Sequence, residues 1–313
     1  MLWEALILLV GLAIIYVGGR FLISGASSAA TELGLTPLVV GATIVAFGTS
    51  APELFLAFFS ALEGEAQVSI GNVIGANINN LTLVLGVFAV LLPIVCGFDT
   101  VRREAYAALL AVGLMAVFAW DGKFEQWEGV IMLVSFIGYL EYLRRCFRGC
   151  AYVEDKEKRK VDRRVLLKGF LFIVVSIGAL ALGADLTVNS AVDLATELGI
   201  STLVIGITVV SVGTVLPEIT VSIIAAREKQ QDIAIGNLLG TLIFNTLVVA
   251  GTAAAISGVA FARADVYFGL AMIFGLLVAV LVVLRYRGAI SRVGGAVLLA
   301  VYLAFTMAIV VFG

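Results

Sequence analysis

Long apolar stretches, separated by short charged segments, recur along the whole chain. A helix needs about 20 apolar residues to cross a bilayer, and the stretches reach that length. A Gly/Ser/Ala-rich linker follows the first stretch and ends at Thr36-Pro37. The pattern predicts an all-α integral membrane protein with ten transmembrane helices, near residues 2–24, 37–62, 67–94, 104–120, 126–147, 165–187, 201–226, 231–257, 264–285 and 291–312.

One part of the pattern occurs twice without a gap. Residues 41–86 recur as residues 206–251, so that each position has a counterpart 165 residues later. The duplication predicts a five-helix repeat over residues 1–147, a linker over 148–164 and a second repeat over 165–313. Because five is odd, the second repeat crosses the membrane upside down, as in many secondary transporters.

The basic residues predict the orientation of these spans. Of the 20 Lys and Arg residues, all but Lys123 and Arg263 lie at one end of the predicted helices, on alternate connections. Since basic residues favour the cytoplasmic side, both termini are expected outside and the central linker in the cytoplasm of a plasma-membrane protein. The linker carries both signs of charge and is interpreted as a solvated connection.

Two acidic residues lie near the middle of predicted spans. Glu53 and Glu218 are counterparts in the two repeats, and neither has a Lys or Arg in its own span. A charged side chain at the centre of a helix costs about 2.5–3.5 kcal/mol on insertion scales. Protonated glutamates that only join helices are one explanation. A visiting cation is the other, and it explains why both copies place the residue behind the same sequence break.

That break is a proline in each repeat. Pro52 and Pro217 cannot donate to the carbonyl four residues earlier, so backbone carbonyls at membrane depth are expected to be free. Such carbonyls are tolerated where they line a wet cavity, and they bind hard cations. A kink that merely bends the helix remains the simpler alternative. The ligand candidates on these two helices are Ala46, Thr49, Ser50, Glu53, Ser211, Thr214 and Glu218.

The following helix of each repeat adds amides and a hydroxyl. Its candidate ligands are Asn77, Asn80, Thr241 and Asn245. Carboxylate, amide, hydroxyl and carbonyl oxygens without thiol or imidazole describe a site for Ca²⁺, Na⁺ or Mg²⁺. The chain has no histidine, and its three cysteines show no metal or disulfide spacing.

The duplicated motifs, Gly-Thr-Ser-x-Pro-Glu and Gly-Asn-x-x-Gly-x-Asn-Ile-x-Asn, resemble the α-repeats of the cation/Ca²⁺ antiporter superfamily. The sequence is most similar to the prokaryotic sodium/calcium exchangers. The resemblance implies alternating access, with Ca²⁺ between Glu53 and Glu218 and Na⁺ sites beside it. It further implies that Ser50 serves a Na⁺ site and that Asn80 serves the central site.

Several positions depart from the family pattern. Val215 and Ala76 stand where serine is common, Leu242 where asparagine is common, and Asn245 where aspartate is common. The loss of two hydroxyls and a carboxylate leaves the Ca²⁺ pair intact but thins the expected Na⁺ sites. Proton/Ca²⁺ exchange therefore remains the alternative coupling.

Other functions fit the sequence less well. A cation channel could use two acidic residues in its filter, but a channel does not require the inverted repeat. A membrane enzyme would need a nucleophile–base pair or a cofactor motif, and the loops contain neither. The expected partners are Ca²⁺, Na⁺ and the lipid bilayer. No cofactor, nucleic acid or obligatory protein partner is implied.

The orientation can be tested by cysteine labelling in intact cells. We expect residues 156–164 to face the cytoplasm and Lys123 to face outside. In a background without the native cysteines, a cysteine at position 123 should react with an impermeant maleimide, and one at position 158 should not. Ready labelling of position 158 from outside would reverse the orientation.

Overall fold

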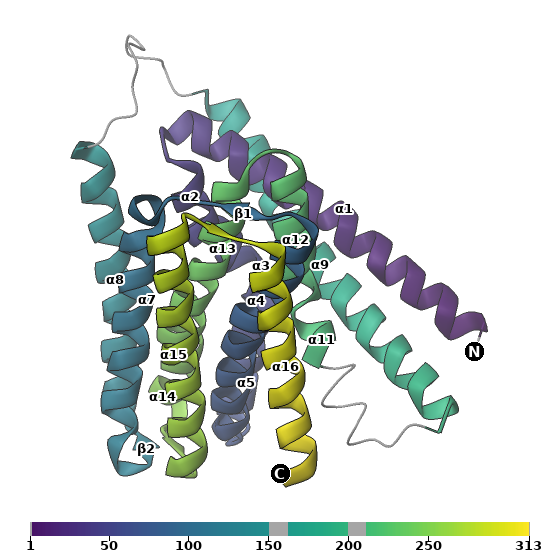
Figure 1. Cartoon of the computed structure of the whole chain (residues 1–313), viewed down its shortest axis with the longest axis vertical. Coiled ribbons are helices and arrows are strands. Elements are labelled where there is room, and N and C mark those ends of the chain that lie inside the picture. Colours follow the sequence, from purple (N-terminus) through teal and green to yellow (C-terminus); the bar gives the residue numbers. More distant parts are fainter. Residues whose placement is uncertain (1, 150–161, 200–210, 313) are drawn as a thin grey trace.

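The computed structural model describes residues 2–149, 162–199 and 211–312, and most of them are helical (Figure 1). Apolar residues with few helix breakers form the long helices, since in lipid the helix satisfies every backbone hydrogen bond internally. The elements of the first half are α1 (Leu2–Leu33), α2 (Pro37–Val40), η1 (Gly41–Val45), α3 (Ala46–Thr49), α4 (Ala51–Leu62), α5 (Ala66–Asn79), η2 (Asn80–Val84), α6 (Leu85–Leu91), β1 (Ile94–Val95), α7 (Phe98–Phe118), η3 (Ala119–Asp121), β2 (Lys123–Phe124) and α8 (Gln126–Gly149).

The second half repeats this order. Its described elements are α9 (Arg163–Glu197), α11 (Ser211–Thr214), α12 (Leu216–Arg227), α13 (Gln231–Phe244), η5 (Asn245–Val249), α14 (Ala250–Ser257), β3 (Val259–Ala260), α15 (Arg263–Arg287), β4 (Ala289–Ile290) and α16 (Arg292–Phe312). The bounds of α12, α13 and η5 lie 165 residues after those of α4, α5 and η2. The duplication in the sequence is therefore a duplication of helices.

Two short antiparallel strand pairs relate the halves to each other. β1 pairs with β4, and β2 pairs with β3. α7 leads from β1 to β2, whereas its counterpart α15 leads from β3 to β4, so the two helices run in opposite directions (Figure 1). The strands were not predicted, because two-residue strands carry no periodicity of their own.

The first span is longer than the sequence predicted. α1 continues through the expected Gly/Ser/Ala-rich linker to Leu33, and its counterpart α9 continues to Glu197. Small residues let these two helices approach closely, since a Cβ on Gly25 would lie 2.7 Å from the carbonyl oxygen of Gly169. The linker expectation was wrong because close packing, rather than intrinsic propensity, decides this segment.

The structure accounts for part of the ten predicted membrane-spanning helices. Within the described ranges, six helices are long and apolar enough to span a membrane, or seven when α2 to α4, bent by 49°, count as one span. Of the other predicted spans, α8 does not meet this criterion, and the apolar part of α16, Arg292–Ala308, is too short to meet it. The span near 201–226 is described only from residue 211 onward. The count of ten remains a prediction.

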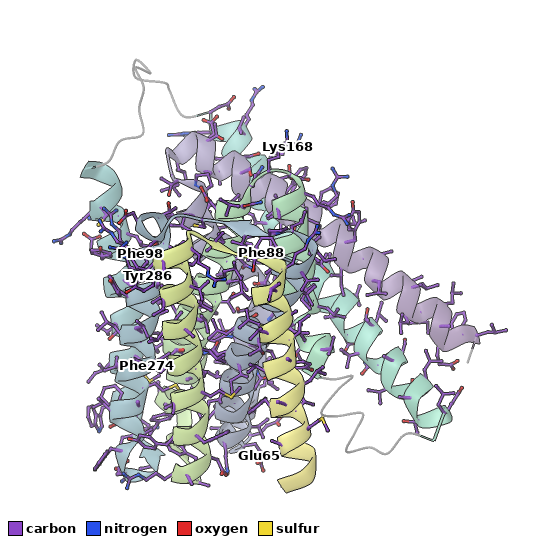
Figure 2. All side chains as sticks on the ribbon, in the orientation of Figure 1. Glu65, Phe88, Phe98, Lys168, Phe274 and Tyr286 are labelled. Atoms are coloured by element: carbon purple, nitrogen blue, oxygen red, sulfur yellow. The ribbon has the colours of Figure 1, made fainter. Side chains whose placement is uncertain are left out.

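The lipid-facing surface and the two ends are those of a membrane protein. Large apolar side chains such as Leu110 and Phe268 are exposed along the helices. Lys168 lies at one end of the molecule and Glu65 at the other, with Phe274 between them (Figure 2). Aromatic rings occupy both levels where the strand pairs lie, as at the interfaces of a bilayer.

The tightest helix contact in the interior joins the two halves. α13 packs on α2 and η1, and glycines make the approach possible. A Cβ on Gly236 would lie 2.1 Å from the carbonyl oxygen of Leu38, and one on Gly240 would lie 2.4 Å from the Cα of Ala42. Only glycine fits between these backbones, so the small-xxx-small spacing has a packing role.

We predict that Gly240→Ala destabilises the protein by about 1–3 kcal/mol, because the added methyl meets backbone that cannot move aside. The matched control is Gly275→Ala on the exposed face of α15, where a Cβ meets nothing within 4 Å among the described residues. Thermal unfolding in detergent measures both. Equal melting temperatures for the two variants would show that the contact between α13 and η1 leaves room for a methyl group.

Candidate cation site

Both predicted acidic residues follow a break in a membrane helix. Between α3 and α4, Ser50 leaves helical geometry with φ −91° and ψ 8°, and Pro52 stands at the start of α4. In the second repeat Val215 takes φ −99° and ψ 6° before α12. Glu53 and Glu218 thus lie in the first turn of the helix that follows each break.

The two carboxylates are buried and close together. Glu53 is 6% exposed and Glu218 is 1% exposed. Glu218 lies close to the carboxylate of Glu53 and to the hydroxyl of Thr49. Within the described part of the chain, neither glutamate forms an ion pair, and atom Oε2 of each has no hydrogen-bond partner. Two buried carboxylates without a protein cation form a centre that attracts cations.

Two asparagines occupy matching positions on the partner helices. Asn80 begins the π-helical segment η2, and Asn245 begins η5. η5 packs on α4 and η2 packs on α12, so each amide-bearing segment supports the broken helix of the other repeat. Both amide atoms of Asn80, and the Oδ1 atom of Asn245, are buried without a partner among the described residues. π-Helical turns inside α-helices are frequent at functional sites.

Hydroxyl oxygens complete the set. Ser50 and Thr241 are fully buried, and the structure gives their hydroxyls no partner among the residues it describes. Thr49 contacts Oδ1 of Asn237 at 3.3 Å. Thr214, the counterpart of Thr49, is also not without a partner in the protein. Most buried polar groups are satisfied in native proteins, so this concentration of unsatisfied oxygens indicates a ligand.

Ala46 and Ser211 were predicted to offer free carbonyls. Ala46 begins α3, and its carbonyl accepts the backbone N–H of Ser50 at 3.0 Å and contacts the hydroxyl of Thr49 at 3.3 Å. The expectation that the break frees this carbonyl is therefore wrong in this conformation. Ser211 begins α11. Its role as a ligand stays a prediction.

Asn77 has a different place from the other predicted ligands. Its Nδ2 donates to the Thr246 hydroxyl at 3.1 Å, and its Oδ1 accepts from Nδ2 of Asn245 at 3.3 Å. This arrangement holds Asn245 with its own Oδ1 free. Protein partners use both ends of the Asn77 amide, which fits an orienting role better than direct coordination.

Two further buried polar residues lie on helices that form the site and were not predicted as ligands. Asn237 is fully buried and has an unpartnered Nδ2, and Ser222 is fully buried with an unpartnered hydroxyl among the described residues. Ser222 follows Glu218 by four residues, so both lie on one helix face. That spacing was visible in the sequence. Asn237 was visible as the counterpart of Asn72 in the duplicated motif.

A cleft of about 280 Å³ reaches this centre from the side of α9. It lies between α4, α9 and the α11–α12 break, and Glu53, Asn72 and Thr214 are among its lining residues. On the other side α1 packs directly on α12, and Asn237, the counterpart of Asn72, is fully buried. Equivalent regions of the two repeats are thus open in one case and closed in the other.

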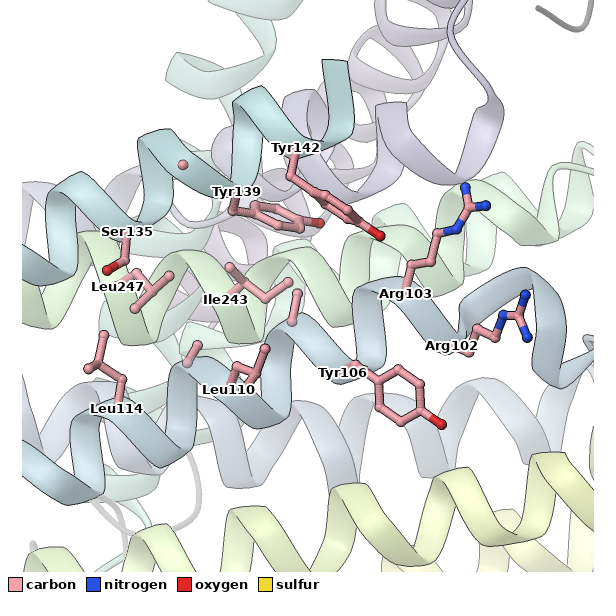
Figure 3. A pocket seen from close by; sticks show the side chains of 13 residues that line it. Arg102, Arg103, Tyr106, Leu110, Leu114, Ser135, Tyr139, Tyr142, Ile243 and Leu247 are labelled. Atoms are coloured by element: carbon pink, nitrogen blue, oxygen red, sulfur yellow. The ribbon is translucent and has the colours of Figure 1, made fainter. Parts of the chain in front are cut away.

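A larger cavity of about 800 Å³ lies elsewhere, between α7 and α8 (Figure 3). Its lining is mainly apolar and includes Ile243 and Leu247, while Arg102, Arg103 and Tyr142 stand at one end. None of the predicted ligands lines it. Its apolar lining gives no set of oxygen ligands for an ion.

The donor set favours a hard cation. It holds two carboxylates and several neutral oxygens, and the chain has no histidine. Groups of three or more His, Cys, Asp or Glu side chains that could hold a metal are absent from the described ranges. Oxygen-only coordination with two formal negative charges suits one Ca²⁺ or two Na⁺ ions.

Comparisons with known proteins agree with this chemistry. A family model described as "Sodium/calcium exchanger protein" matches residues 3–144 and 168–311. The chain is 32% identical to the putative antiporter CaxA of Alkalimonas amylolytica, over 97% of this chain and 98% of that protein. It is 30% identical to the sodium/calcium exchanger MaX1 of Methanosarcina acetivorans, over 96% of each.

A solved structure has the same architecture. The sodium-calcium exchanger NCX_Mj, soaked with 10 mM Na⁺ and zero Ca²⁺, superimposes with a TM-score of 0.83 at 27% identity, covering 99% of each chain. Another structure of NCX_Mj, soaked with 2.5 mM Na⁺ and 10 mM Sr²⁺, gives a TM-score of 0.82. The superposition covers both halves of the chain.

We predict that Asn77→Leu, which introduces the residue found at the counterpart position 242, weakens Ca²⁺ binding about two- to tenfold. This is the effect of one or two lost hydrogen bonds. Because Asn77 acts through Asn245, the double variant with Asn245→Ala should bind no more weakly than Asn245→Ala alone. Isothermal titration of the purified protein measures the cycle. Additive losses would show instead that Asn77 binds the ion directly.

Proposed function

Because this chain belongs to the sodium/calcium exchanger family, we propose that it is a secondary active antiporter that exchanges Ca²⁺ for Na⁺ by alternating access. Ca²⁺ binds between Glu53 and Glu218. Further oxygens for Ca²⁺ or Na⁺ come from Thr49, Thr214, Ser50, Asn80, Asn245, Thr241 and the carbonyl of Ser211. Family membership, the resemblance predicted from the duplicated motifs, is confirmed by the family model and by the match to NCX_Mj.

One observation carries the proposal. Buried oxygens from both repeats meet at Glu53 and Glu218, and several of them have no partner among the described residues. An empty pair of carboxylates at membrane depth is costly, and a bound cation removes that cost. The protein can therefore change the side from which the site is accessible more easily when an ion has neutralised the carboxylates. An antiporter requires this, because an empty site that changed sides freely would let ions leak without exchange.

The architecture proposed for this cycle is ten crossings in two inverted repeats, residues 1–147 and 165–313, joined by the cytoplasmic linker 148–164. The matching bounds of the α4–η2 and α12–η5 segments support the repeat. The opposite directions of α7 and α15 support the inversion. The family and the apolar helices make this a multi-pass membrane protein. Both termini are placed outside on the distribution of basic residues alone.

The described conformation fits the outward-facing state of such a cycle. α9 runs from the linker end of the molecule toward the opposite side, and the cleft that reaches Glu53 lies along its second half. With the linker in the cytoplasm, the cleft opens outward. The buried Asn237 and the contact of α1 with α12 close the inner side. Closure on one side also disfavours a continuous channel.

The coupling ion is the less constrained part of the proposal. Val215 and Ala76 are buried at positions where related exchangers commonly have serine, and neither side chain can bind Na⁺. We propose Na⁺ coupling with fewer or weaker Na⁺ sites. Proton/Ca²⁺ exchange is the second candidate, because protonation of Glu53 and Glu218 would also neutralise the site. The relatives compared above are exchangers and antiporters rather than enzymes.

Purified protein in Ca²⁺-loaded vesicles tests the function. We expect an inward Na⁺ gradient at equal pH to release Ca²⁺, and a pH gradient without Na⁺ to release little. Glu53→Gln and Glu218→Gln should each abolish release, because a neutral amide cannot replace the attraction of a carboxylate for a divalent ion. The matched control is Glu104→Gln, which changes a buried glutamate of α7 away from the site and should retain transport.

Each contrary outcome has a distinct meaning. Release by a pH gradient alone would replace Na⁺ with protons as the coupling ion. Full release by either Gln variant at positions 53 and 218 would place the Ca²⁺ site elsewhere. Release without any counter-ion on the opposite side would indicate a channel.

A further inference from the structure

The cleft that reaches Glu53 has a second acidic residue in its wall. Asp185 on α9 lines the same cleft as Glu53 and is exposed to it, and Asn72 lines it from α5. The Nδ2 atom of Asn189 donates to Oδ1 of Asp185 at 3.0 Å. This neutral contact fixes the carboxylate and leaves its charge in place. The structure gives Asp185 no basic partner among the residues it describes.

The charge at this position is not shared by the two repeats. The counterpart of Asp185 in the first repeat is Arg20, and Arg20 approaches Glu228 at the end of α12 with 3.8 Å between Nε and Oε1. The counterpart of Glu228 is Glu63. The positions that hold Arg20 and Glu228 in one case therefore hold the two carboxylates of Asp185 and Glu63 in the other. An ion pair therefore accompanies the closed inner side, whereas the open outer side has an uncompensated negative charge.

Asp185 is not an isolated surface charge. At the end of the same cleft stands Glu53, which is 6% exposed and has an unpartnered Oε2 among the described residues. A cation that enters the cleft encounters the exposed carboxylate and then the buried one. Clefts lined by one sign of charge raise the local concentration of the opposite ion, and low-dielectric walls strengthen the effect.

We propose that Asp185 is an outer capture site for cations, at which Ca²⁺ or Na⁺ is bound transiently before it reaches Glu53 and Glu218. This inference rests on the proposed function and adds a residue that the central site does not contain. Because Arg20 occupies the counterpart position, the inner face has no equivalent of Asp185 there. A divalent ion gains twice the electrostatic energy of a monovalent one, so the site favours Ca²⁺ over Na⁺ at that face.

Asp185→Asn tests the proposal, with Asp193→Asn as the matched control. Asp193 is exposed on the same helix but does not line the cleft. Transport is measured in membrane vesicles of defined orientation, with ions added to one face at a time. For Asp185→Asn at low ionic strength, the half-saturating Ca²⁺ concentration at the outer face should rise about fourfold, and that for Na⁺ about twofold.

Three further measurements test whether the charge of Asp185 causes the change in the half-saturating concentrations. The half-saturating concentrations at the inner face should not change. At about 1 M choline chloride the difference from the unmodified protein should disappear, because charges are screened within about 3 Å. Asp185→Glu should behave as the unmodified protein, and Asp185→Arg should give a larger outer-face defect than Asp185→Asn.

The opposite results overturn the proposal. They are an unchanged outer-face value in Asp185→Asn, an equal change in Asp193→Asn, an equal change at both faces, or a defect that persists at high salt. The test is separate from that of the proposed function. If Glu53→Gln abolishes transport while Asp185→Asn changes nothing, the central site stands and only the capture site is wrong.

Discussion

The structure depends on two carboxylates that are held at membrane depth without a protein cation beside them. Glu53 and Glu218 are nearly fully buried and lie near each other, so their charges raise the energy of the folded chain. A protein tolerates such a pair when a ligand neutralises it. The broken helices, the π-helical segments and the unpartnered amides are arranged around this requirement. Neutral oxygens surround the carboxylates, so among the described residues only the two glutamates could compensate the charge of a cation at this position.

The duplicated fold supplies the carboxylates from opposite directions. Each broken helix packs against the π-helical segment of the other repeat, and glycines of α13 bring its backbone against η1. The two halves therefore form one site together, with candidate ligands from both. A movement of one repeat against the other would change access to the site while leaving its ligands in place, and this is the physical basis of the alternating access proposed above.

Much of this site could be predicted because its signals are local. A proline, a carboxylate and an asparagine at fixed spacing, repeated 165 residues later, gave the broken helices and most of the buried ligands. The missed features depend on contacts between distant segments. The π-helical form of η2 and η5 has no sequence signal, and the helical continuation of α1 through its Gly/Ser/Ala-rich stretch depends on α9. The sequence predicts Asn77 as a ligand and does not show that Asn245 and Thr246 contact both ends of its amide, which is why an orienting role could not be predicted.

The differences between the repeats are as informative as their similarity. A perfectly symmetric pair of repeats would have no preferred side, since the inner and outer cavities would be equivalent. In this chain Asn77 has Leu242 as its counterpart, and Asp185 has Arg20. The first difference gives one amide a fixed orientation in the centre of the site. The second places an ion pair between α1 and α12 in one copy, and in the other an exposed carboxylate in the cleft that has no basic partner among the described residues. The repeat thus builds the site, and differences such as these two give the copies different polar and charged groups around it.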